Sequence, residues 1–236
     1  MQKTLDNKIF CGSKFKQTFI NVLGRGSCQV ISFVNPFSYM EVVKNKSLIN
    51  EIEYYFSDGA LLCKMHSLFH NKIARASFDF SSIANLFLQY SADNNISLAI
   101  VGAQQAEVEL AVFKLKQLYP NLQIVYFRNG YIADTGELIN ELNKVQPKIV
   151  LLGMGSPFQE KMAVSIKNHL TATSLIITCG GFLTQTSIKA DYYHPLVKKL
   201  GVRWLQRMVM HKHVRNRVLK EYPKFMYYYL LSKMKK

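Results

Sequence analysis

Short apolar runs alternate with longer segments of helical periodicity along the first 190 residues. The apolar runs, which we predict as strands, cover residues 29–34, 97–103, 122–127, 148–152 and 174–181. The predicted helices run from 38 toward 56, up to 118, from 136 to 145 and from 157 to 169. Strands that alternate with helices of this length form parallel sheets covered by helices. We therefore predict an α/β fold with a mostly parallel sheet.

The stretch GMGSPFQEKM, which follows the fourth apolar run, predicts a strand, a glycine turn and a helix start. Ser156 suits a helix N-cap and Pro157 suits the first helical position. Gln159 then completes an S-x-x-Q capping box. In an open α/β sheet, turns of this kind at the carboxyl ends of strands bind ligands, and a helix N-terminus favours an anion. Whether Gln159 only caps its helix or also faces a ligand stays open.

The last 41 residues have a different pattern, which predicts a basic helical appendage. One side of a helix would carry Leu196, Leu200, Trp204, Leu205, Met208 and Val209, with basic residues between them. Pro223 would divide the segment, because proline interrupts a helix. We predict a body over residues 1–195 and an appendage over residues 196–236.

Charge is concentrated in this appendage. It contains twelve Lys or Arg and one acid, Glu221, and so carries +11 of the total formal charge of +15. A nearly neutral body with a basic tail indicates an anionic partner for the tail. Aromatics and leucines beside lysines, as in KFMYYYLLSKMKK, are typical of contact with an anionic membrane surface. One alternative is a helical hairpin that packs on the body with a solvated basic face. Another is contact with nucleic acid, which is less favoured because nothing in the tail resembles a known DNA- or RNA-binding motif.

Cysteine usage and hydropathy indicate a cytoplasmic protein. The four cysteines lack C-x-x-C spacing, which disfavours both a disulfide framework and a zinc knuckle. The first 15 residues lack the apolar core of a signal peptide. No apolar run approaches the roughly 18 residues of a membrane-spanning helix.

Taken singly, the polar candidates have ordinary explanations. Asp58 in SDGAL and Asn35 in FVNPF suit turns, while Arg75 and Asp79 in ARASFDFSS suit a surface arginine and a helix-capping acid. His66 and His70 have i, i+4 spacing but lack the glutamate of an H-E-x-x-H zinc motif. Serine-hydrolase, P-loop and dinucleotide-binding motifs are absent from the sequence.

The order of the motifs is more specific than any one of them. The blocks LAIVGA, LYPNLQIVYFRNGY, GMGSPFQEK, Gly180-Gly181 and LGVRWLQR follow one another along the chain. In this order they resemble the WecG/TagA/CpsF family of bacterial glycosyltransferases (glycosyltransferase family 26). The resemblance extends from about residue 29 to residue 222.

The resemblance implies a Rossmann-like body and transfer of a sugar from a UDP-sugar to an undecaprenyl-diphosphate-linked saccharide. The sugar would be an N-acetylhexosamine, a hexose or a uronic acid, and the product would enter surface polysaccharide biosynthesis. The implied reaction inverts the anomeric centre and needs no metal and no cofactor. The protein would be peripheral on the inner face of the cytoplasmic membrane, with the appendage on the anionic lipid surface. Whether the protein forms a homo-oligomer stays open.

The resemblance also assigns residues to roles. Asp58, in the Asp58-Gly59 motif, would be the general base, which fits an inverting displacement. Arg75 would hold a phosphate group. The other implied donor- or acceptor-binding residues are Asn35, Gly59, Gly102, Gly130, Tyr131, Gly155, Gln159 and Glu160. In the appendage, Arg203, Arg207, Arg215 and Arg217 would contact phosphates or the membrane.

This sequence departs from the family pattern where S-F-D and R-A-P are expected. Thr184 replaces the aspartate, Tyr192-Tyr193-His194 replaces R-A-P, and Phe33 replaces a threonine. These departures leave the transferred sugar open. The alternative hypothesis is a non-catalytic α/β protein that docks on a membrane or polyanion through its basic tail.

Overall fold

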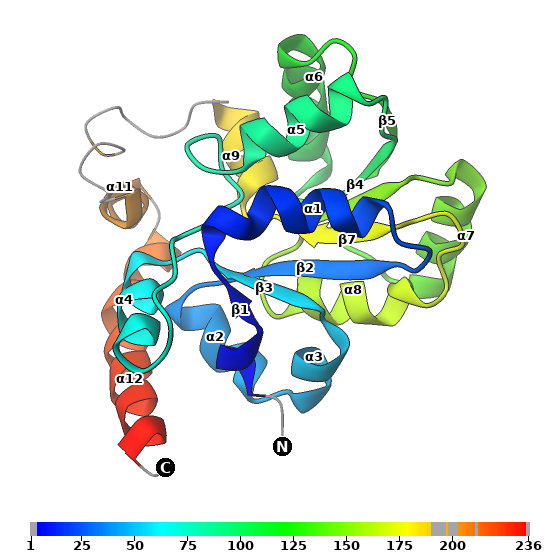
Figure 1. Cartoon of the computed structure of the whole chain (residues 1–236). Helices are drawn as coiled ribbons and strands as arrows, with labels where there is room; N and C mark the ends of the chain where they lie inside the picture. The colour runs from blue at the N-terminus through cyan, green and yellow to red at the C-terminus, as the bar shows by residue number, and fades with distance from the viewer. Residues whose placement is uncertain (1–3, 190–196, 198–202, 211, 235–236) are drawn as a thin grey trace.

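Seven strands form one sheet, and every strand pairing in the described part of the chain is parallel. The computed structural model describes residues 4–189, 197, 203–210 and 212–234 (Figure 1). The strand order is β1-β3-β2-β7-β6-β4-β5. The strands are β1 (Ile9–Phe10), β2 (Gln29–Val34), β3 (Tyr54–Ser57), β4 (Leu98–Gly102), β5 (Ile124–Arg128), β6 (Ile149–Gly153) and β7 (Leu175–Thr178). The predicted α/β fold class is confirmed.

Helices cover both faces of the sheet (Figure 1). One face is packed by α1 (Phe15–Leu23), α5 (Ala84–Asp93), α6 (Gln105–Leu118) and α9 (Phe182–Ile188). The other is packed by α2 (Pro36–Val43), α3 (Lys46–Glu51), α4 (Ala60–Phe69), α7 (Thr135–Val145), α8 (Phe158–Lys167) and α12 (Lys212–Met234). The remaining helical segments are η1 (Leu5–Lys8), η2 (Gly12–Lys14) and α11 (Arg203–Met210). Because the central strands are covered on both sides, they read as continuous apolar runs.

The sequence prediction was wrong between residues 38 and 56. The expected helix is two short helices, α2 and α3, followed by strand β3. Asn45 begins the second helix, since its side-chain oxygen accepts hydrogen bonds from the backbone N–H groups of Ser47 and Leu48. Strand β3 has only four residues, too few for a periodicity signal, yet it lies between β1 and β2 and buries Tyr55 and Phe56 completely.

The predicted break at Pro223 was also wrong, because α12 runs through it. The helix is held by the body after this residue. Phe225 and Tyr229 are fully buried, and the helix packs along α2 and α4 (Figure 1). The hydroxyl of Tyr229 donates to Asp6 Oδ1 at 3.0 Å, and Lys233 Nζ donates to Asp6 Oδ2. Tertiary packing of this kind offsets the one backbone hydrogen bond that proline cannot make.

The ends of β4 and β6 approach each other closely at two glycines. A Cβ on Gly102 would lie 2.4 Å from the carbonyl oxygen of Gly153. The loops that follow these two strands therefore leave the sheet from neighbouring points, at the edge where the candidate site lies.

Candidate active site

A pocket opens at the carboxyl edge of the sheet, where loops after β2, β3, β6 and β7 meet. It is lined by Phe33, Asn35, Phe37, Ser38, Asp58, Ser77, Phe78, Asp79, Gly155, Ser156, Gln159, Cys179, Gly180, Gly181, Phe182 and Gln185. The carboxyl ends of parallel strands share one edge, which is where open α/β sheets bind ligands. The structure therefore brings Asn35, Asp58, Gly155 and Gln159 together from distant parts of the sequence.

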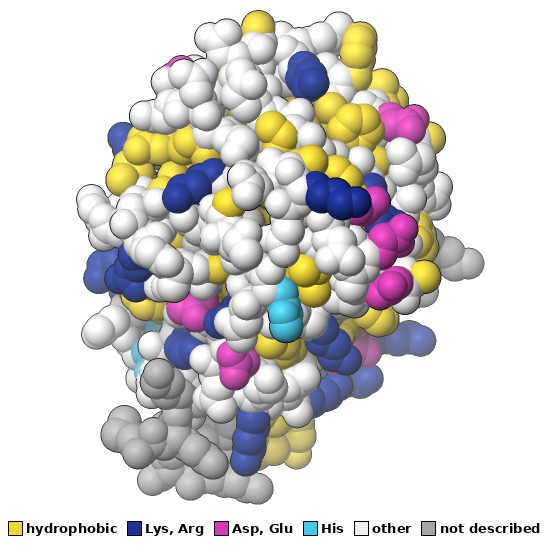
Figure 2. Space-filling model, turned by 90° about the vertical axis from the view of Figure 1, so that its right-hand side faces the viewer, with side chains coloured by type: hydrophobic (Ala, Val, Ile, Leu, Met, Phe, Trp, Pro, Cys, Tyr) yellow, Lys and Arg dark blue, Asp and Glu magenta, His cyan; other side chains and the backbone are white. Residues whose placement is uncertain are grey.

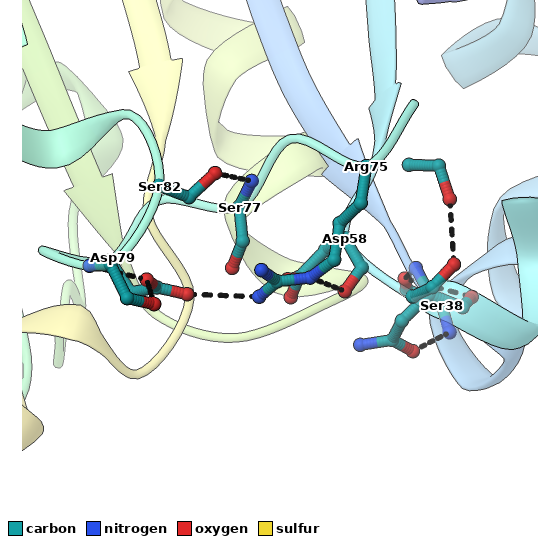
Figure 3. A network of polar contacts seen from close by, with 10 residues as sticks. Ser38, Asp58, Arg75, Ser77, Asp79 and Ser82 are labelled. Carbon is teal, nitrogen blue, oxygen red and sulfur yellow. Dashed lines mark hydrogen bonds and ion pairs between the residues drawn. The ribbon is translucent and has the colours of Figure 1, made fainter. Parts of the chain in front are cut away.

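Asp58 follows β3 directly and is fixed on both its backbone and its side chain. Its backbone N–H donates to the carbonyl of Val34 at 2.8 Å. The guanidinium of Arg75 donates to the Asp58 carbonyl at 3.1 Å and to Asp58 Oδ1 at 3.2 Å. The same guanidinium donates to Asp79 Oδ2 at 2.9 Å, so Arg75 lies between two carboxylates (Figure 3). This arrangement fixes the direction of the Asp58 carboxylate at the pocket.

Gly59 and Asn35 set how closely the loops after β2 and β3 pack. A Cβ on Gly59 would lie 2.9 Å from Pro36 Cδ, so a larger residue would push the two loops apart. Asn35 caps α2, because its side-chain oxygen accepts from the N–H groups of Phe37 and Ser38 at 3.0 and 3.1 Å. The turn role considered for Asn35 and its place in the pocket therefore coexist.

Asp79, for which the sequence alone indicates only a helix-capping role, lines the pocket. It is buried, and it accepts hydrogen bonds from the backbone N–H and hydroxyl of Ser81 in addition to the ion pair with Arg75. Burial raises the pKa of the Asp79 carboxyl, but the charge of Arg75 and hydrogen bonds from Ser81 and Ser77 outweigh it and leave the pKa below its ordinary value. Its four-residue spacing from Arg75 was the available sequence signal.

Replacing Asp79 with asparagine should reduce stability in a pH-dependent way. The folded-state pKa is lowered, so this carboxylate contributes stability that is complete above its unfolded-state pKa of about 3.9 and is lost as the pH falls through the folded-state value. At pH 7 we expect Asp79→Asn to lower the free energy of unfolding by about 2 kcal/mol, as for a charge-assisted hydrogen bond. Urea unfolding should show this difference shrinking toward pH 3. A difference that stays constant would contradict the assignment; Asp93→Asn, at an exposed position on α5, is the control.

The loop from β6 to α8 differs from the predicted capping box. Helix α8 begins at Phe158, and Ser156 makes no backbone cap; its hydroxyl donates to Glu160 Oε1 at 2.9 Å instead. Gly155 has φ +75°, a conformation that side-chain-bearing residues rarely adopt, and this turns the chain toward the helix. Gln159 joins two loops, since its oxygen accepts from the Gly180 N–H at 3.1 Å and its nitrogen donates to Glu160. The capping prediction was wrong because the helix begins one residue later than expected, with Pro157 at the N-cap position and the Gln159 side chain directed to Gly180 and Glu160.

A second hollow lies on the other side of this loop, toward β5. It is lined by Gly130, Tyr131, Ile132, Ala133, Thr135, Met154, Phe158, Lys161, Met162 and Ser165. A Cβ on Gly130 would lie 3.0 Å from Gly102 Cα, which brings these two expected site residues together. Tyr131 and Phe158 are largely exposed at its rim. The β6–α8 loop thus separates one hollow holding Asp58 from another holding Gly130 and Tyr131.

The remaining sequence candidates lie outside the two hollows or outside the described residues. Glu160 is fully buried beneath the first pocket. Thr184 donates to Glu107 Oε2 at 3.2 Å, between α9 and α6. Arg215 is exposed on α12. The side chains of Arg203, Arg207 and Arg217, and residues 192–194, lie outside the described part of the structure.

The electrostatics of the first pocket suit an anionic group. Helices α2 and α8 both begin at residues that line it or adjoin its lining. A helix N-terminus carries a partial positive charge, which these two helix starts direct toward the pocket even though Asn35 already accepts from the Phe37 and Ser38 N–H groups. The pocket thus combines an anion-attracting side with the carboxylates of Asp58 and Asp79, an arrangement that can hold a phosphate group and accept a proton.

Comparisons with known proteins agree with the ordered motifs. A family model described as "Glycosyl transferase WecG/TagA/CpsF family" matches residues 10–236. A UDP-Gal:alpha-D-GlcNAc-diphosphoundecaprenol beta-1,4-galactosyltransferase from Shigella boydii is 39% identical over 210 residues, or 88% of this chain and 88% of that protein.

Two more distant relatives share one activity. The N-acetylglucosaminyldiphosphoundecaprenol N-acetyl-beta-D-mannosaminyltransferase of Bacillus subtilis (strain 168) is 22% identical over 184 residues, 77% of this chain and 71% of that protein. Its counterpart from Staphylococcus aureus (strain MW2) is 26% identical over 189 residues, 80% of this chain and 73% of that protein.

Proposed function

Because the chain belongs to the WecG/TagA/CpsF family of glycosyltransferases, we propose that it transfers a hexose from a UDP-sugar to GlcNAc-diphosphoundecaprenol, with inversion of the anomeric centre. The observation that carries this proposal is the pocket in which Asp58, held by Arg75, meets the anion-attracting start of α8. The protein is a glycosyltransferase, and no observation favours the non-catalytic alternative.

The relatives support the acceptor more strongly than the donor. Their names share a GlcNAc-diphosphoundecaprenol acceptor, whereas the sugar they transfer is galactose in one case and N-acetylmannosamine in the others. Galactose is the first donor sugar to test, because the Shigella boydii relative has the higher identity. Among the departures from the family pattern, Phe33 lines the first pocket and is a place where sugar selectivity can differ from the mannosaminyltransferases.

In the proposed reaction, Asp58 takes the proton of the acceptor hydroxyl while the oxygen of that hydroxyl bonds to the anomeric carbon. The bond between that carbon and the UDP oxygen breaks, and the charge passes to the departing diphosphate. One carboxylate directed at the incoming oxygen satisfies an inverting displacement. The start of α8, the Arg75 guanidinium and the appendage arginines are the groups proposed to stabilise the diphosphate. No step of this account calls for a metal or a cofactor.

The two hollows provide separate places for the reacting groups and for the nucleotide base of the donor. We assign the transferred sugar and the acceptor hydroxyl to the pocket with Asp58. The aromatic rim of Tyr131 and Phe158, in the second hollow, suits a flat base, since aromatic side chains stack on such rings. The β6–α8 loop would then lie under the diphosphate that joins them.

The acceptor is a membrane lipid, so we propose that the protein works on the cytoplasmic face of the membrane as a peripheral protein. None of the helices in the described residues has the length and apolar character needed to cross a bilayer. Helix α12 instead exposes an apolar stripe, defined as Leu219, Met226, Leu230 and Met234, which share one side of the helix. If residues 196–236 form the appendage, as proposed, this stripe is the part of it that would contact lipid.

A thermal-shift experiment with nucleotides tests the donor class. UDP at about 100 times its Kd should raise the melting temperature by about 5 °C or more, because it binds only the folded state. ADP at the same concentration is the control, and the measurement is made in EDTA. No shift with UDP or with any UDP-sugar would overturn the donor assignment.

A further inference from the structure

Glu160 lies in the first turn of α8 with 0% of its surface exposed. Its Oε1 atom accepts three hydrogen bonds of 2.9 Å, from Ser32 Oγ on β2, Ser156 Oγ and Gln159 Nε2. Its Oε2 atom is buried and has no hydrogen-bond partner among the described residues. This buried carboxyl group thus makes all of its hydrogen bonds with other side chains through one of its two oxygens.

The hydrogen bonds around Glu160 extend to both neighbouring loops of the pocket. Thr178 on β7 donates to Ser32 Oγ at 3.0 Å, and Ser32 donates to Glu160. On the pocket side, the Gly180 N–H donates to Gln159 Oε1 at 3.1 Å, and Gln159 donates to Glu160. The donors therefore converge on Glu160, which is the shared acceptor joining two strands to the loops after β6 and β7.

Fold stability alone gives no reason for a carboxyl group at this position. Burial raises the pKa of Glu160, although hydrogen bonds from Gln159, Ser32 and Ser156 counteract it. Burying an acidic group with one unpartnered oxygen costs free energy, which the hydrogen bonds to its other oxygen offset only in part. The residues that Glu160 holds, in contrast, line the pocket.

We propose that Glu160 is a positioning residue, which orients Ser156 and Gln159 and, through Gln159, the Gly180 amide, so that the loops after β6 and β7 form the pocket wall. Glu160 itself does not touch substrate. This positioning role rests on the proposed function in one respect: the rate of sugar transfer is one of the two quantities that test it.

Two variants of Glu160 separate positioning from a purely structural role. Glu160→Gln keeps an accepting oxygen in place of Oε1, so kcat should stay within about threefold of wild type. Glu160→Leu removes the shared acceptor at similar volume. Three donors lose their acceptor, so the melting temperature of this variant should fall by a few degrees. At a temperature where it is still fully folded, kcat should fall about 100-fold, the size of effect expected from misplacing reacting groups by about 1 Å.

Amide hydrogen exchange at Gly180 provides a readout that is independent of catalysis. We expect exchange to accelerate in Glu160→Leu, where Gln159 loses its anchor, and to be unchanged in Glu160→Gln. Should Glu160→Leu fail to fold, Ser32→Ala removes one donor to the same oxygen, and it should give a smaller loss of kcat and a smaller gain in exchange.

The outcomes distinguish this inference from the proposed function. If wild type shows no sugar transfer, the proposed function fails, while the Gly180 exchange result still decides the positioning role. If wild type transfers sugar and Glu160→Leu does so at the same rate, the positioning role is wrong. An activity loss in both variants that follows a fall in melting temperature would also overturn it.

Discussion

The Asp58→Asn variant should lose about a thousandfold in kcat while remaining folded, because positioned general bases contribute rate factors of roughly a hundred to ten thousand. Asparagine keeps an oxygen that can accept from Arg75, and the second Arg75 contact is to the Asp58 backbone carbonyl. The substituted side chain cannot take up the proton of the acceptor hydroxyl. The loss should therefore appear in turnover and not in folding.

Measurements of UDP release, UDP binding and melting temperature together check this expectation. UDP affinity should stay within about threefold, since Asp58 is assigned to the acceptor hydroxyl and not to the nucleotide. The control is Asp93→Asn, an exposed carboxylate at the end of α5, which should have wild-type turnover. An Asp58→Asn enzyme with near-normal turnover would remove Asp58 as the base.

The second large effect should follow from changes to the apolar stripe of α12. Replacing Leu219, Met226 and Met234 with serine removes three apolar side chains that are 62%, 40% and 78% exposed. At about 1 kcal/mol for each side chain placed in lipid, binding to vesicles should weaken about 100-fold. Transfer to a lipid-linked acceptor in those vesicles should fall with it. The fold should persist, because Phe225 and Tyr229, which hold α12 in the core, are not changed.

The neighbouring surface explains why this face suits an anionic membrane. Leu68 and Phe69 at the end of α4 are exposed, and the ring of Phe69 lies 6.2 Å from that of Tyr229. Lys220 and Lys224 are exposed on α12. On the face that carries β5 and α7, by contrast, basic, acidic and apolar side chains are mixed (Figure 2). Binding should therefore require anionic lipid and weaken with salt.

A matched control uses exposed apolar side chains at the far edge of the sheet. Leu118, Val125 and Phe127 are 50%, 42% and 39% exposed on α6 and β5, and β5 lies at the edge opposite β1. Their replacement with serine should leave vesicle binding unchanged. Equal losses in the two triple variants, or no loss in the α12 variant, would contradict the proposed membrane face.

The sequence predicted the parts of the fold that have strong local signals. Long apolar strands such as Gln29–Val34 and Ile149–Gly153 are buried on both faces, so their composition alone identifies them. Strand β3 was missed because its four residues follow two helices whose periodicity extends toward it. Since β3 places Asp58 at the sheet edge, the physical reason for the Asp58-Gly59 motif became visible only in the fold.

Long-range polar contacts were beyond prediction from local sequence. Arg75 and Asp58 are 17 positions apart, and Ser32 meets Glu160 from 128 positions away. Asp6 and Lys233, at opposite ends of the described chain, are 227 positions apart. Local pattern gives none of these residues a partner, and only the packing of the sheet and α12 brings the partners together.

Acceptor-dependent release of UDP by the purified wild-type protein tests the central claim most directly. The assay uses a panel of UDP-sugars, a synthetic prenyl-diphosphate-GlcNAc acceptor and EDTA. We predict that one donor, with UDP-galactose tested first, releases UDP only when the acceptor is present, and that the product carries the inverted anomeric configuration. Absence of release with every donor, together with no UDP-induced thermal shift, would contradict the account.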